Sequence, residues 1–214
     1  QHSVGVAPDL NPSAGALSPV PQVLAFGFAP TGGFDHDLFV TSGDPRMLTS
    51  QWTWNDAGPD GSETATLRAT VATSAWSPAS PDPSAIGFDN LRDRLMVSDG
   101  EVEEMTIYAG KNVWEASRAG VVSRSTTTVG YSNEPVGITF QSSPRTFYIS
   151  DDGTPDAVYV LTVGPDGLLH TADDTRRSFS VSNFTTDPVG LAFDSVNREL
   201  WIAGGETNRV YRLR

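Results

Sequence analysis

Two stretches of nearly the same sequence, EPVGITF at residues 134–140 and DPVGLAF at residues 187–193, decide how this chain is organised. Related segments, AFGF at 25–28 and AIGF at 85–88, occur earlier in the chain. An apolar triplet follows each of the four segments, at residues 38–40, 95–97, 147–149 and 200–202. It starts seven positions after the repeated Phe in the last three copies and ten positions after it in the first copy. Gly and Asp residues that favour tight turns come next, so each unit is predicted to contain antiparallel hairpins.

Two further strands are expected in each unit. The third strand is expected about ten residues after the triplet begins, at residues 47–48, 105–107, 158–160 and 210–212. A fourth strand is visible in three units, at residues 65–71, 123–129 and 177–181. Long amphipathic helical patterns are missing, and 20 Gly and 15 Pro residues argue against a helical bundle. The sequence therefore predicts a single all-β domain that covers residues 1–214.

The spacing of the units predicts how many there are. The repeated Phe residues lie 60, 52 and 53 positions apart, and the residues outside them amount to 49, close to one more unit. The last unit stops after its third strand, whereas the Pro-rich lead of residues 1–22 offers a spare strand at residues 2–7. We therefore predict a four-bladed β-propeller whose last blade is completed by the N-terminal strand, from the same chain or a neighbouring subunit. The blades are expected to start near residues 23, 83, 135 and 188. A β-sandwich is the alternative, because it also uses short strands with regular turns.

The repeat also has a recognisable form. The phrase DPVGLAFD at 187–194, followed by RELWI at 198–202 and TNRVY at 207–211, resembles the repeat of NHL-type and gluconolactonase-type propellers. The resemblance implies propeller blades and no particular activity, since one fold hosts many functions. Gluconolactonase-type enzymes hold a metal in the central channel with carboxylates and an Asn. No position of this chain matches that ligand pattern.

Charge and composition limit which binding partners and which cellular compartment we expect. The formal net charge is −12 and Lys111 is the one lysine, so the chain is a poor binder of nucleic acid or anionic lipid. No run of 18 apolar residues could span a membrane. Cysteine is absent, charged residues are sparse, and the sequence starts at Gln1 rather than Met. We expect a processed protein that is secreted, extracellular or on the cell surface; a trimmed cytosolic domain is the alternative.

One loop is a candidate metal site. Asp166, Asp173 and Asp174 lie in the segment between the third and fourth strands of their unit, where three carboxylates could come together on a hard cation such as Ca²⁺. The EF-hand spacing is absent, and Pro165-Asp166-Gly167 also forms a good turn without any metal.

A second set of acidic residues recurs after the triplets. Its members could meet as ligands at one mouth of a central channel, but hairpin chemistry explains them equally, and we favour the turn interpretation. The residues are Asp44, Asp99, Asp151, Asp152 and Glu206.

The sequence offers no convincing catalytic set. Its histidines, His2, His36 and His170, are scattered, and neither a Gly-x-Ser-x-Gly elbow nor a phosphate-binding loop is present. Trp114 lies in a polar, Gly-flanked stretch and is expected to be the most exposed aromatic side chain. We expect a non-enzymatic scaffold or binding module; in one version of it, copies of the chain join by strand exchange through the N-terminal segment into a filament. The alternative is a lactonase-like hydrolase with a divalent ion in the channel.

Overall fold

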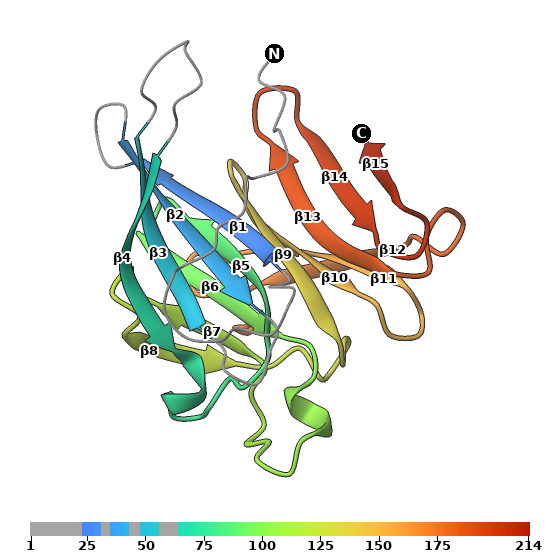
Figure 1. The fold of residues 1–214 in the computed structure, drawn as a ribbon. Helices are drawn as coiled ribbons and strands as arrows, with labels where there is room; N and C mark the ends of the chain where they lie inside the picture. The colour runs from blue at the N-terminus through green and yellow to red at the C-terminus, as the bar shows by residue number, and fades with distance from the viewer. Residues whose placement is uncertain (1–22, 31–34, 43–47, 56–63) are drawn as a thin grey trace.

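The computed structural model describes residues 23–30, 35–42, 48–55 and 64–214 (Figure 1). In these residues there is no α-helix, and the strands pair into four antiparallel sheets. The all-β prediction is therefore confirmed for the part of the chain that is described. The first sheet contains β1 (Val23–Pro30), β2 (Asp35–Ser42), β3 (Leu48–Asn55) and β4 (Thr64–Ala72); the second contains β5 (Pro83–Asp89), β6 (Arg94–Asp99), β7 (Val113–Ala116) and β8 (Val122–Thr126). The third contains β9 (Pro135–Ser142), β10 (Arg145–Asp151), β11 (Ala157–Thr162) and β12 (Thr175–Ser180); the fourth contains β13 (Pro188–Asp194), β14 (Glu199–Gly204) and β15 (Arg209–Leu213).

The first hairpin of each unit keeps the same register throughout. The repeated Phe lies opposite the first residue of the apolar triplet in every sheet, as Phe88 does opposite Leu95 and Phe193 opposite Leu200. In the second and fourth sheets an aspartate stabilises the turn: Asp89 Oδ1 accepts hydrogen bonds from the backbone N–H groups of the turn, and Asp194 Oδ1 does the same. Such Asx turns fix a hairpin locally, which is why the repeat could be read from sequence.

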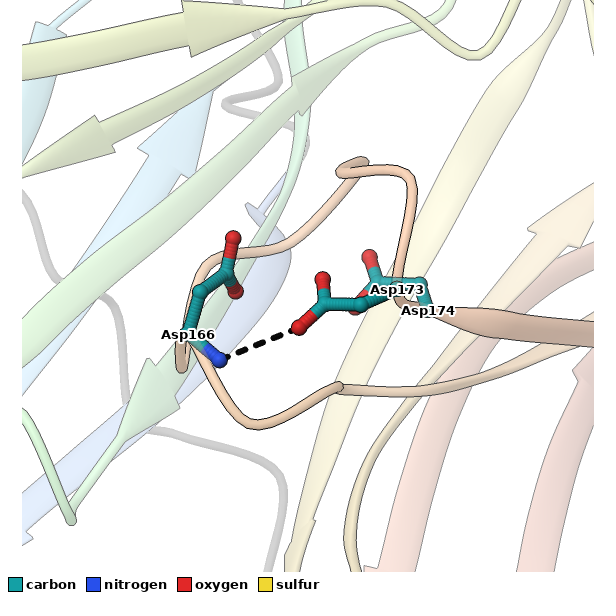
Figure 2. Close-up of side chains that lie close together, drawn as sticks. All are labelled: Asp166, Asp173 and Asp174. Atoms are coloured by element: carbon teal, nitrogen blue, oxygen red, sulfur yellow. Dashed lines mark hydrogen bonds between the residues drawn. The ribbon is translucent and has the colours of Figure 1, made fainter.

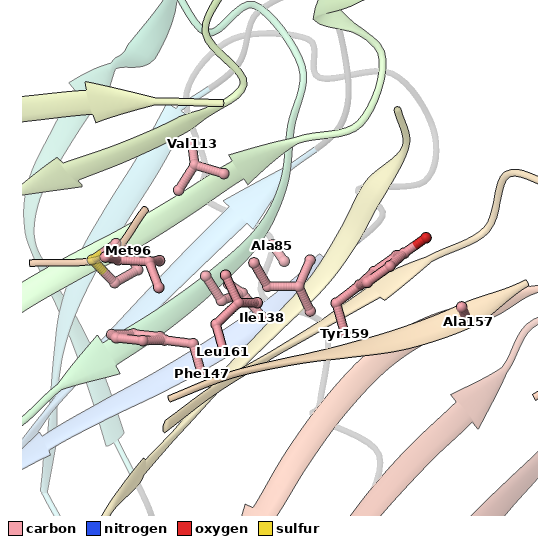
Figure 3. Close-up of a cluster of buried hydrophobic side chains, with 10 residues drawn as sticks. Ala85, Met96, Val113, Ile138, Phe147, Ala157, Tyr159 and Leu161 are labelled. Carbon is pink, nitrogen blue, oxygen red and sulfur yellow. The ribbon is translucent and has the colours of Figure 1, made fainter. Parts of the chain in front are cut away.

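Apolar side chains fill the space between successive sheets. The first strands are neighbours in chain order, β1 with β5, β5 with β9 and β9 with β13. One core cluster lies between the second and third sheets (Figure 3) and includes Ala85, Met96, Val113, Ile138, Phe147, Ile149, Tyr159 and Leu161. Another joins the third and fourth sheets and is centred on Val158, Val181, Leu200 and Ile202. Each fully buried Ile or Phe contributes about 1.5–3 kcal/mol, so the contacts between sheets supply much of the stability.

Two expectations about the second unit are wrong. Residues 105–107 are not its third strand, because the connection after Asp99 first forms a short 3-10 helix (Val102–Glu104) and the strand begins only at Val113. Trp114 is not exposed but fully buried. Its indole Nε1 donates to the Pro78 carbonyl at 2.9 Å, and its ring lies 6.3 Å from that of Trp76. Long-range packing therefore overrides the polar local sequence.

Other expectations fall outside the described residues. The N-terminal strand at residues 2–7, His2, Asp44 and the insertion around residues 31–33 all do. In the described chain the expected strands at 158–160, 177–181 and 210–212 correspond to β11, β12 and β15. No helix in the described ranges is long and apolar enough to cross a membrane.

Candidate functional site

The three predicted metal ligands lie together in the connection between β11 and β12, residues 163–174, which we call the aspartate loop. One carboxylate oxygen from each of Asp166, Asp173 and Asp174 lies within 4.8 Å of the others (Figure 2). A tight turn brings them together: the Gly167 N–H donates to the Gly164 carbonyl at 3.1 Å, and Gly167 has a φ of +70°, a conformation that glycine adopts easily. The sequence thus places the three aspartates correctly within one loop.

The loop's own donors already engage these carboxylates. Asp173 accepts from the Asp166 N–H at 3.1 Å and from the Thr171 hydroxyl at 2.6 Å. Asp174 accepts from the backbone N–H groups of Gly164 at 2.8 Å and Thr171 at 3.1 Å. The hydroxyl of Thr171 and the N–H of Asp166 lower the pKa of Asp173, which is fully exposed. The hydrogen bonds account for the order of the loop, and a cation would have to compete with them.

His170 anchors the aspartate loop to the second sheet. Its Nδ1 lies in hydrogen-bond contact with Thr126 Oγ1, and its Nε2 lies 2.6 Å from the hydroxyl of Tyr131. Burial, together with the positive charges of Arg124 and Arg176, lowers the pKa of His170 to about 4. The imidazole is therefore neutral at pH 7, and with both nitrogens engaged it is not free to act as a general base.

Two arginines donate hydrogen bonds to backbone carbonyl groups of the same loop. Arg124 donates to the Leu169 carbonyl, and Arg145 donates both to the Gly167 carbonyl and to the carboxylate of Asp89. Asp89 is fully buried, so this ion pair lies between the second and third sheets. Sequence reasoning missed His170 and both arginines, because their partners are 22 to 56 residues away. Through these contacts the aspartate loop links the second sheet to the third.

Acidic side chains gather at the opposite end of the sheets, where each sheet begins. Register brings them together: Pro83 pairs with Asp99 and Pro135 with Asp151, so the residues before each first strand lie beside the end of the second strand. In the connections at this end Lys111 is the sole basic residue within the described ranges. The acidic end comprises Asp82, Asp99, Glu101, Glu103, Glu104, Glu134, Asp151, Asp152, Asp156, Asp187 and Glu206.

Two of these aspartates have a plain structural role. Asp99 is fully buried and accepts hydrogen bonds from the Ser80 hydroxyl at 2.8 Å, the Asp82 N–H at 2.9 Å and the Val102 N–H at 3.0 Å. Asp151 accepts from the Gly153 N–H at 3.1 Å. Both aspartates are therefore hydrogen-bonded within their own connections, Asp151 in a hairpin turn as predicted and Asp99 before a short 3-10 helix rather than in a tight hairpin.

Burial, and after it the charge of neighbouring carboxylates, raises the pKa of Asp82, Glu101, Glu103, Asp152 and Asp187. Burial raises the pKa of Glu103 to about 7, with help from the charges of Asp99, Glu101 and Glu134. Both carboxylate oxygens of Glu103 are buried without a hydrogen-bond partner. Burial also raises the pKa of Asp152, followed by its contact with Glu134. Among the described residues, however, the aspartate loop is the one group of three whose oxygens lie close enough to share an ion, so the acidic end does not form a ready-made metal site.

The comparisons with known proteins bear on the fold alone. No protein-family model matches the chain, and no curated protein matches it significantly. Among solved structures, the chain is similar to a chain in the crystal structure of a nidogen/laminin complex, with a TM-score of 0.56 and 17% sequence identity. The likeness covers 91% of this chain but only 61% of that one, so this chain spans about three fifths of the length of its structural neighbour. Together with the four sheets that pack in chain order, this likeness identifies the fold as a β-propeller.

Proposed function

We propose that this protein is an extracellular, non-enzymatic β-propeller that serves as a scaffold or binding module. In this proposal four blades surround one axis, and the strand of residues 2–7 completes the last blade, from the same chain or from a neighbouring copy. The observation that carries the proposal is that the outer edge of β15 pairs with no other strand of the described residues. The neighbour of similar fold comes from a complex of two proteins, which supports a binding role for this type of fold.

Among the described residues, the fourth sheet alone has a third strand without a fourth strand beside it. Its third strand, β15, pairs with β14 alone, whereas β7 carries β8 and β11 carries β12. The outer N–H and C=O groups of such a strand are a template for another strand, and main-chain hydrogen bonds across it would give affinity. Residues 2–7, with Val4 and Val6 alternating with smaller or polar residues, have the composition of a short strand.

Light scattering on the purified chain tests the assembly version of this proposal. If a neighbouring copy supplies the strand, the mass will rise with concentration above the 22.8 kDa of one chain. A variant that lacks residues 1–8 will then stay monomeric or will aggregate through the exposed edge. If the shortened chain melts as cooperatively as the full chain and assembles in the same way, the N-terminal segment is not the completing strand.

A metal-dependent hydrolase is the second candidate function. It is favoured by Glu103, whose pKa near neutrality is suited to a general acid or base. An assay of lactone hydrolysis with and without divalent cations tests it. Metal-dependent turnover that Glu103→Gln abolishes would support the hydrolase, and no turnover with any cation would remove it.

Calcium binding by the aspartate loop stays a prediction. Because the carboxylates already accept several hydrogen bonds, we expect weak binding, on the order of millimolar, as in other extracellular modules. Calorimetric titration of the wild type and of Asp173→Asn is the test, with Asp93→Asn as a control in another turn. Binding that survives Asp173→Asn would place calcium elsewhere.

A further inference from the structure

Each sheet has two faces. From the second sheet onward, one face packs against the preceding sheet in chain order. We call the face toward the next sheet in chain order the leading face and the opposite one the trailing face. The leading face of the second sheet, with Ala85, Met96 and Val113, packs against Ile138, Phe147 and Ile149 on the trailing face of the third. Tyr148 and Val158 on the leading face of the third sheet are covered in the same way by the fourth.

The leading face of the fourth sheet is uncovered in the described structure. Pairing with the second strand identifies equivalent positions: Val113 lies opposite Ser98, Val158 opposite Ser150, and Val210 opposite Ala203. Val113 and Val158 are 0% exposed, but Val210 is 64% exposed. On the same face Ala192 is exposed and Trp201 is only half-buried. The position that is fully buried in the second and third sheets is thus exposed in the fourth.

The surface that would fit this face also exists in the chain. The trailing faces that cover a neighbour carry an apolar pair at one register position: Ile86 with Val97, Ile138 with Ile149, and Leu191 with Ile202. The first sheet has Phe26 opposite Val40 at the corresponding position. No described sheet precedes the first one, and β13 does not pack against β1 as the other successive first strands pack against each other.

We propose that the first sheet, β1–β4, of a second copy of this chain covers the leading face of the fourth sheet. The contact continues the interface that already repeats between sheets one to four, now from one copy to the next. It is head-to-tail, so it closes a small ring or extends into a fibre, depending on the rotation between copies. The proposal rests on the assembly version of the proposed function, in which a neighbouring copy completes the last blade, and it replaces closure of the four blades within one chain.

One neighbouring copy can supply both parts of the proposed contact, its first sheet and its N-terminal strand. In each chain the candidate strand at residues 2–7 is followed by β1, which starts at Val23. The fifteen intervening residues reach at most about 50 Å when extended, at about 3.3 Å per residue. One copy can therefore place its first sheet on the leading face and its N-terminal strand on the edge of β15.

The experiment compares two charge substitutions on the full chain by sedimentation velocity over a wide concentration range. Val210→Asp puts a carboxylate in the middle of the proposed contact. Val196→Asp is the matched control, because Val196 is 87% exposed and lies in the β13–β14 turn of the same sheet. Both valines are exposed, so both variants will fold, which circular dichroism verifies. We expect the wild type and Val196→Asp to associate alike and Val210→Asp to associate at least about tenfold more weakly.

The outcomes separate this proposal from the one on which it rests. If the wild type associates and Val210→Asp associates equally well, while deletion of residues 1–8 abolishes association, strand exchange stands and the face contact is wrong. If Val196→Asp weakens association as much as Val210→Asp, added charge is the cause and the face contact is again wrong. A wild type that stays monomeric at every concentration overturns both self-assembly and the face contact.

Discussion

At the scale of single residues, the ionisable groups that the fold has buried say most about how the protein responds to its surroundings. Burial in the contact between two sheets keeps His170 neutral at pH 7, whereas burial at the acidic end raises the pKa of Glu103 to about 7, so its carboxyl is neutral only below that pH. Their effects on stability have opposite signs, because one is a base and the other an acid.

His170 will make the protein less stable as the pH falls. Its pKa is about 4 in the folded chain against 6.5 for an ordinary histidine, so the unfolded chain takes up the proton first. The free energy of unfolding therefore decreases from about pH 6.5 toward pH 4, by up to about 3 kcal/mol. Urea unfolding at several pH values will show this slope in the wild type and a smaller one in His170→Gln. An equal slope in the variant would mean that other groups cause it.

Glu103 will make the protein less stable as the pH rises. Its folded pKa is about 7 against 4.5 for an ordinary glutamate, so the stability that the neutral carboxyl provides is lost as the pH rises between these values. At pH 8 we expect Glu103→Gln to be more stable than the wild type by about 1 kcal/mol, since solvent screens this partly exposed group. The difference will fade toward pH 5. Glu104→Gln, an exposed neighbour with the same change in net charge, is the control in thermal melts.

At the scale of elements, the ion pair between Asp89 and Arg145 connects the first hairpin of the second sheet with that of the third. Removing either partner leaves a buried charge alone, which costs about 3–5 kcal/mol. Arg145→Met also releases the Gly167 carbonyl of the aspartate loop. We expect urea unfolding to show this loss for Arg145→Met and a partial recovery in the double variant with Asp89→Asn. If the double variant is as unstable as Arg145→Met, the loop contact matters more than the charge pair.

The elements also show what the sequence could predict. Hairpins with a local cause, such as the turn at Asp194, were predictable, because strand alternation and turn residues lie within ten positions of each other. The third strand of the second sheet was not, since Met105, Thr106 and Ile107 have the composition of a strand but follow the 3-10 helix that Asp99 organises.

In the candidate site, too, residues close together in the sequence were predictable, and contacts between distant residues were not. The three aspartates of the aspartate loop were predictable, because nine residues of sequence contain them all. The anchors of that loop were not, since Thr126 and Tyr131 reach His170 from 44 and 39 residues away. Trp114 was misplaced for the same reason: its partner Pro78 lies 36 residues away.

At the scale of the whole molecule, charge sets the conditions for association. Each copy carries a formal net charge of −12, so two copies repel each other at low salt. Salt screens this repulsion, with a Debye length of about 10 Å at 0.1 M. We therefore expect the association constant measured by sedimentation to rise when sodium chloride is raised from low to moderate concentration. A fall instead would indicate that opposite charges, rather than apolar faces, hold the copies together.

The uneven placement of carboxylates has a physical consequence of its own. The acidic end has almost no basic residues, whereas at the other end the carboxylates, those of the aspartate loop included, are accompanied by arginines such as Arg92, Arg94, Arg145 and Arg198. The molecule is thus an electric dipole as well as an anion. Near any charged surface a torque acts on it before contact is made, and it arrives with one pole foremost.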